Sequence, residues 1–120
     1  MGPRRGKHGL TLLTTVRDGD VVLVTAAGEI DLASVGDFRA VLSDACGAGE
    51  KLVVDLSRVG YLSCAGLRAL EETSRARPAL SVVATGSLVL RAFAVSGIAT
   101  TVPVRPRLRE ACAAAGVATR

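Results

Sequence analysis

Residues 51–70, KLVVDLSRVGYLSCAGLRAL, decide the fold, because they join a buried strand to a helix. Residues 51–56 form a short apolar run rich in β-branched side chains, which predicts a buried strand. Residues 57–62 are predicted to be a connection, and Ser63 stands where a helix N-cap is expected, with Cys64 opening the first turn. In α/β proteins such a helix start, just beyond a strand, is a common place for sites that respond to ligands. We therefore expect the functional site of this chain here.

The residues before this segment predict a hairpin followed by a helix. Residues 10–17 and 20–26 are strand-like runs separated by Asp-Gly, a pair typical of hairpin turns. Residues 32–46 follow with apolar side chains at helical spacing. The sequence Gly-Ala-Gly at residues 47–49 is expected to end that helix.

The residues after this segment continue the alternation of helix and strand. Pro78 ends the helix, residues 79–85 are predicted to be a strand, and Ser87 is expected to cap a third helix that ends at residues 96–97. Residues 99–104 predict a short or edge strand, and residues 105–116 a terminal helix. The whole pattern predicts an α/β fold with a mixed, mostly parallel sheet of about five strands and four flanking helices.

Composition limits the domain organisation and the partners. The chain has 120 residues, 49% of them hydrophobic, with only two Phe and one Tyr, so we expect one domain with an aliphatic core. We divide it into a flexible basic leader, residues 1–9, and a single domain, residues 10–117. The net charge of +4 owes three positive charges to that leader, namely Arg4, Arg5 and Lys7. The body lacks clustered basic residues with aromatic stacking partners, so nucleic-acid binding is not expected.

Membrane, metal and enzyme chemistry are not expected either. No apolar run approaches the roughly 20 residues of a membrane span. The three cysteines, Cys46, Cys64 and Cys112, are odd in number and fit reduced cytoplasmic thiols, with no spacing typical of a metal site. The single histidine, His8, lies in the leader, and the chain contains no phosphate-binding loop of the Walker type. We therefore expect no enzyme activity and no cofactor.

Three segments carry a family resemblance. GEID at residues 28–31, VVDLSRVGYLSCAGLRAL at residues 53–70 and LRAFAVSGI at residues 90–98 resemble the signature segments of STAS domains. More narrowly, they resemble those of the small stand-alone anti-sigma factor antagonists, with similarity from about residue 21 to residue 115. The resemblance implies a cytoplasmic, non-enzymatic regulator of transcription that binds an anti-sigma factor, usually a serine kinase, and thereby releases a sigma factor.

The resemblance also implies a switch, at which this chain departs from the family pattern. The kinase of such systems phosphorylates a Ser or Thr at the start of the second helix, where this chain has Cys64, and the preceding Asp position holds Ser63. We expect phosphorylation control to be lost at Cys64, since a serine kinase cannot form its usual phosphoester on a thiol. The alternatives are that Ser63 has become the phosphoacceptor or that oxidation of the thiol is itself the switch.

The resemblance implies that the partner binds at the start of this helix. The residues expected to bind it are Asp31, Ser63, Cys64, Gly66, Leu67 and Arg68. Three of them also have a purely structural interpretation. Asp31 can cap the helix that begins at residue 32 or 33, Cys64 can fill a small site, and Arg68 can be a solvated helix residue.

Gly66 is expected to serve partner binding. Glycine in a first turn costs about 1 kcal/mol relative to Ala, a cost that close approach of a partner would justify. On this view a bulky residue at Gly66 weakens binding and leaves the melting temperature nearly unchanged.

A second functional class stays open. The alternative is a STAS domain that serves as the binding subunit of another assembly, such as a phospholipid-transport ABC complex or the stressosome. A weak homodimer is compatible with either class.

Overall fold

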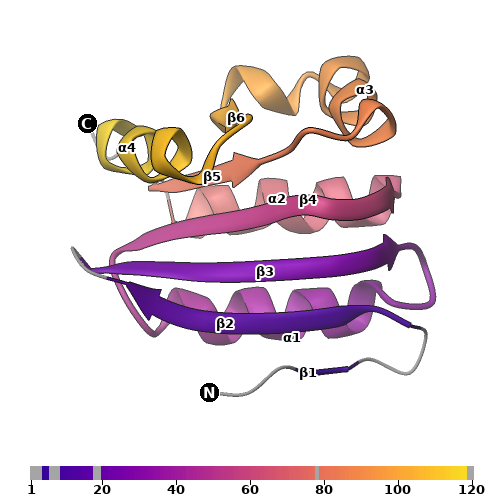
Figure 1. Ribbon diagram of the computed structural model, residues 1–120, viewed down its shortest axis with the longest axis horizontal. Helices are drawn as coiled ribbons and strands as arrows, with labels where there is room; N and C mark the ends of the chain where they lie inside the picture. The colour runs from indigo at the N-terminus through magenta and orange to yellow at the C-terminus, as the bar shows by residue number, and fades with distance from the viewer. Residues whose placement is uncertain (1–3, 6–8, 18–19, 78, 119–120) are drawn as a thin grey trace.

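A single mixed sheet organises the molecule (Figure 1). The computed structural model describes residues 4–5, 9–17, 20–77 and 79–118. Its six strands lie side by side in chain order: β1 (Arg4–Arg5), β2 (Thr11–Arg17), β3 (Val21–Ile30), β4 (Lys51–Leu62), β5 (Leu80–Val83) and β6 (Val104–Arg105). β1, β2 and β3 pair antiparallel, and β3 to β6 pair parallel. The predicted mixed, mostly parallel sheet is thus confirmed, and β1 falls inside the predicted leader.

The predicted four helices are also confirmed, and they cover both faces of the sheet. They are α1 (Val35–Cys46), α2 (Cys64–Ala76), α3 (Ser87–Ser96) and α4 (Leu108–Ala118), with a 3-10 turn η1 (Ile98–Thr100) after α3. Figure 1 shows α1 and α2 behind the sheet, while Ala111 and Ala115 of α4 pack against Leu23 and Val53 on the opposite face. No helix among the described residues is long and apolar enough to cross a membrane.

β4 is central, and both faces of its first half are buried. Leu52 and Val54 pack into the core beneath α1 and α2, whereas Val53 points to α4. A strand covered on both sides needs a continuous apolar run, which explains the sequence at residues 52–54. β5 pairs only with residues 52–55 of β4, and α3 covers the part of β4 beyond β5 with Val89 and Phe93.

The predicted connection at residues 57–62 is wrong, because β4 continues to Leu62. β3 and β4 stay paired along this stretch, but the register shifts between Thr25 and Ala27 and again between Gly28 and Glu29. Such irregularities break the alternation of buried and exposed residues. The sequence Ser57-Arg58 therefore has the pattern of a loop although it belongs to a strand.

Other boundaries also differ from the prediction: β3 continues to Ile30 instead of ending at residue 26, and α4 begins at Leu108 rather than at residue 105. α1 begins at Val35 with Ser34 as N-cap, rather than at residue 32. The N-cap of α3 is Gly86, so Ser87 is the first helical residue instead of the cap. The last strand was expected at residues 99–104, but η1 occupies the first part and the strand is limited to Val104–Arg105. The Asp18-Gly19 turn lies outside the described residues, although the strands on either side of it pair as predicted.

Candidate partner-binding site

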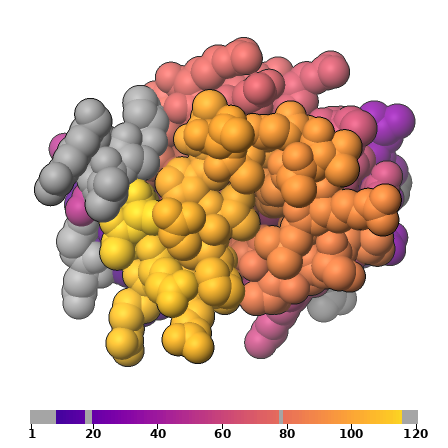
Figure 2. All heavy atoms as spheres, turned by 90° about the horizontal axis from the view of Figure 1, so that it is seen from above, coloured from indigo at the N-terminus to yellow at the C-terminus, as the bar shows by residue number. Residues whose placement is uncertain are grey.

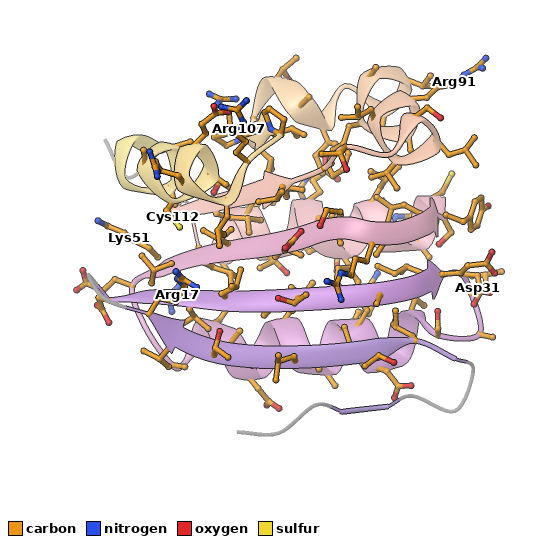
Figure 3. The ribbon with its side chains drawn as sticks, viewed as in Figure 1. Arg17, Asp31, Lys51, Arg91, Arg107 and Cys112 are labelled. Atoms are coloured by element: carbon orange, nitrogen blue, oxygen red, sulfur yellow. The ribbon has the colours of Figure 1, made fainter. Side chains whose placement is uncertain are left out.

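The start of α2 lies at the C-terminal ends of β3 and β4. The backbone N–H of Ser63 donates to the carbonyl of Ile30, at 2.8 Å, which ties the end of one strand to the start of the helix. Asp31 directly follows Ile30, and Figure 3 shows it at the end of the sheet to which the β3 and β4 arrows point. The structure thus brings Asp31, Ser63 and Cys64 together, as parallel strands that end at one edge are expected to do.

Ser63 and Cys64 face in different directions. Ser63 is 8% exposed, and its hydroxyl accepts a hydrogen bond from the N–H of Gly66 at 3.2 Å, so the predicted N-cap is confirmed. Cys64 is the first residue of the helix, and its side chain is exposed. The thiol is therefore the more accessible of the two groups, since the neighbouring hydroxyl is largely buried and accepts a hydrogen bond from the helix backbone.

Asp31 stabilises the turn that leads into α1. Its Oδ1 accepts from the N–H of Ser34 at 3.0 Å, and its own N–H donates to the Ser34 hydroxyl at 3.0 Å. The Ser34 hydroxyl in turn donates to the carbonyl of Glu29 at 2.8 Å. α1 is assigned from Val35, with Ser34 before it, and the N–H of Val35 donates to the carbonyl of Asp31 at 2.9 Å. Together with the reciprocal bonds between Asp31 and Ser34, this is the hydrogen-bond pattern of a capping box, so the alternative that Asp31 caps the entry into this helix is supported. The carboxylate also holds the loop between β3 and α1 in place beside Ser63.

Two shallow hollows flank Cys64. The first, of about 490 Å³, is lined by Asp31, Leu32, Ala33, Tyr61, Ser63, Cys64 and Ala65. The second, of about 170 Å³, lies towards the end of α3 and is lined by Cys64, Leu67, Arg68, Glu71, Ser96 and Ile98. We call these two hollows together the α2 N-terminal surface.

Two apolar residues of this surface were missed in the sequence. Leu32 is 82% exposed and Tyr61 is 47% exposed, which is unusual for large apolar side chains that flank a single hollow. Leu32 had been assigned to the predicted helix at residues 32–46, and Tyr61 to a connection. The only sequence feature that could have indicated this exposure is the position of Leu32, a large apolar residue directly after the GEID segment.

Gly66 does not line the α2 N-terminal surface, so the structure gives no support to the prediction that it contacts the partner. It is buried, and a Cβ at this position would lie 2.6 Å from Cδ1 of Leu62 and 2.9 Å from Cγ2 of Ile30. The glycine therefore lets the first turn of α2 approach the ends of β3 and β4. Leu67 is also buried and borders only the second hollow, while Arg68 is exposed there.

The cysteines and acidic residues form no metal site among the described residues. All three cysteines are free thiols: Cys64 is exposed, and Cys46 and Cys112 are half-buried. Cys112 packs against the margin of the cluster beneath α4. The α2 N-terminal surface is thus of mixed apolar and charged character.

Comparison with known proteins places this fold and helix start in the STAS class. The family model described as "Mlab, STAS domain" matches residues 13–110, so the chain belongs to this family. None of the curated protein sequences that were compared matches the chain.

Solved structures support the same assignment. The structure resembles an anti-sigma factor antagonist from Mycobacterium paratuberculosis, with a TM-score of 0.84 and 28% identity over 94% of this chain and 99% of that one. It also resembles the anti-sigma factor antagonist SpoIIAA in its unphosphorylated form, with a TM-score of 0.69 and 19% identity over 83% of this chain and 91% of that one. A putative anti-sigma factor antagonist from Thermotoga maritima gives a TM-score of 0.73 and 18% identity over 91% and 95% of the two chains. At these lower identities, the last two are evidence for the fold alone.

Replacing Gly66 by Val is expected to destabilise the fold by about 1–3 kcal/mol, because the new side chain overpacks the contact with Leu62 and Ile30. Urea unfolding measures the loss. Gly60→Val is the matched control: a Cβ at this exposed position of β4 meets no atom within 4 Å, so a change within about 0.5 kcal/mol is expected. An unchanged unfolding midpoint for Gly66→Val would contradict the packing role.

Replacing Ser63 by Ala is expected to cost about 1 kcal/mol, because the N–H of Gly66 loses its acceptor at the start of α2. Thermal unfolding followed by circular dichroism tests this. Ser87→Ala serves as the control, since Ser87 also begins a helix but makes no capping hydrogen bond. If both variants melt at the same temperature, the Ser63 hydroxyl does not contribute as a cap.

Proposed function

We propose that this protein is an anti-sigma factor antagonist, which binds an anti-sigma factor through the α2 N-terminal surface and so releases a sigma factor. The observation that carries the proposal is the similarity, at 28% identity and almost full coverage of both chains, to a structure described as an anti-sigma factor antagonist. The proposal treats the protein as a binding module rather than an enzyme, acting in the cytoplasm.

The α2 N-terminal surface has the physical properties of a protein interface. Leu32 and Tyr61 supply apolar area that is exposed in the isolated chain, and Asp31, Arg68 and Glu71 supply charges at its margins. An apolar centre with a polar rim is the usual composition of such interfaces. The sheet holds the helix start rigidly, so binding requires little ordering of the surface.

The proposed partner is an anti-sigma factor that is itself a serine kinase, and Cys64 then determines how the complex is controlled. Cys64 occupies the exposed first position of α2, where the family resemblance places the phosphoacceptor. A thiol there leaves the kinase without its usual hydroxyl. The hydroxyl of Ser63 is not equivalent, because it is largely buried and accepts the capping hydrogen bond. We propose that this antagonist is not inactivated by phosphorylation at residue 64.

A second candidate is a STAS subunit of another assembly, such as a phospholipid-transport ABC complex or the stressosome. The matching family model is described by both names, Mlab and STAS domain. This description does not distinguish the two candidates. Affinity purification of the protein from the cytosol of its own organism, followed by identification of the bound chain, separates them. An anti-sigma factor supports the first candidate, and a transporter subunit supports the second.

Leu32→Glu is expected to weaken binding of the anti-sigma factor by at least about tenfold, because a charge replaces an apolar side chain at the centre of the interface. Isothermal titration calorimetry measures the affinity. The control is Val16→Glu on β2: Val16 is also exposed but pairs with Val22, near the start of β3 and therefore at the other end of the sheet. Equal affinities for the two variants would place the interface elsewhere.

Incubation with the kinase and ATP is expected to leave residue 64 without phosphate, whereas Cys64→Ser restores a hydroxyl at the same exposed position. Cys64→Glu is expected to weaken binding, because it adds a negative charge to the interface. Mass spectrometry of proteolytic fragments reports the modified residue. Stoichiometric phosphate on Ser63 would contradict the proposed loss of control, and reversible oxidation of Cys64 that alters binding would replace it with a redox switch.

A further inference from the structure

Three exposed arginines lie together at the edge of the sheet that is farthest from β1. Arg105 belongs to β6, Arg107 to the short connection that follows, and Arg109 to the first turn of α4. Figure 2 looks onto this side of the molecule, where α4, η1 and α3 form the surface, and Figure 3 shows Arg107 beside the start of α4. We call these three residues the β6–α4 edge.

The β6–α4 edge is part of an uneven distribution of charge. Residues 79–118 contain four arginines and one glutamate, which gives this segment a formal charge of +3. Residues 20–77 contain six basic and nine acidic side chains, a formal charge of −3. The positive charge of the described body is therefore concentrated on its C-terminal third, although the sequence as a whole shows no basic stripe.

The fold does not use these arginines. The ion pairs of the described residues join Arg39 to Glu72 and Arg75 to Glu71, on α1 and α2. The described residues of the β6–α4 edge, by contrast, show one side-chain hydrogen bond. Arg105 donates it to the carbonyl of its neighbour Val104. Cations near the start of a helix also oppose the helix dipole. Of the three, only Arg109 lies in the first turn of α4, where Glu110 supplies an opposite charge, and none of the three forms an ion pair in the described part of the chain.

The backbone beneath these side chains is well fixed. Backbone hydrogen bonds hold the segment around β6 to the segment around β5. The N–H of Val82 donates to the carbonyl of Pro103 at 2.9 Å, and the N–H of Ala84 donates to the carbonyl of Arg105 at 3.0 Å. α4 is tied to β5 by the hydroxyl of Ser81, which donates to the carbonyl of Ala111. The arginines are therefore presented by a rigid edge, and Pro103 and Pro106 make that edge a poor template for a further strand.

We propose that the β6–α4 edge is a second binding surface, which takes an acidic protein segment rich in Glu or Asp. Guanidinium groups bind carboxylates by paired hydrogen bonds, and three of them without a carboxylate partner match a short run of acidic side chains. Nucleic acid fits less well, because single strands need aromatic stacking partners. Phe38 and Phe93 are buried, and Tyr61 lies on the α2 N-terminal surface.

A fluorescein-labelled poly-glutamate peptide tests this proposal, with binding measured by fluorescence anisotropy. The triple variant R105E/R107E/R109E is expected to bind the peptide at least about tenfold more weakly than the native chain. The matched control is R17E/K51E/R58E, which changes the net charge equally on β2 and β4 and is expected to keep most of the affinity. Raising NaCl from about 50 mM to about 300 mM is expected to weaken native binding several-fold, since surface charges are screened.

Circular dichroism establishes that each variant is folded, and R107A, which lies outside helix and strand, replaces the triple variant if that one unfolds. Amide chemical shifts that change on peptide addition are expected to cluster at residues 104–111. The proposal is overturned if both triple variants lose binding equally, if the peptide does not bind at all, or if a thymidine oligonucleotide binds the same edge more tightly than the peptide. None of these outcomes depends on the α2 N-terminal surface or on the anti-sigma factor.

Discussion

The contact between the first turn of α2 and the ends of β3 and β4 fixes the geometry of the site. Gly66 faces Ile30 and Leu62 so closely that a Cβ would overlap both side chains. Successive helical residues are rotated by about 100°, so Cys64, two positions earlier, points away from the sheet when Gly66 points into it. The hydrogen bond from the Gly66 N–H to Ser63 fixes the same turn from the other side. The exposure of Cys64 is therefore a consequence of how tightly Gly66 packs.

This geometry separates what the fold requires from what regulation requires. Ser63 and Gly66 are constrained by a cap and by a close contact, so few other residues can replace them without loss of stability. Cys64 is exposed and at the first helical position, where the backbone N–H needs no partner within the helix. The fold places little demand on the side chain there. The presence of a thiol instead of a hydroxyl consequently bears on control of binding and hardly at all on folding.

The position of α2 and the parallel sheet could be predicted from the sequence, because both follow from local patterns along the chain. The position of α2 was predictable because a capping serine precedes a run of helical periodicity, and the parallel sheet followed from the alternation of elements. The second half of β4 could not be predicted. The register shifts against β3 disturb the two-residue alternation of buried and exposed side chains on which strand prediction depends.

The role of Gly66 and the exposure of Leu32 could not be predicted for a different reason. A sequence gives the type of a residue but not the face of the helix that meets the sheet, so a glycine needed for packing looks like one needed for a partner. Likewise an exposed leucine has the same letter as a buried one, and only the tertiary contacts of the loop after β3 distinguish them.

The rigid sheet also determines how the two exposed surfaces relate. The α2 N-terminal surface depends on the last residues of β3 and β4, whereas the β6–α4 edge depends on the pairing of β6 with β5. β5 pairs only with the first part of β4, so the two surfaces share neither a strand nor a side chain. A partner on one surface therefore leaves the residues of the other exposed, and charge changes at the arginines lie outside the contacts that orient Cys64. Two partners with different chemistry, one largely apolar and one acidic, are thus compatible with the same small domain.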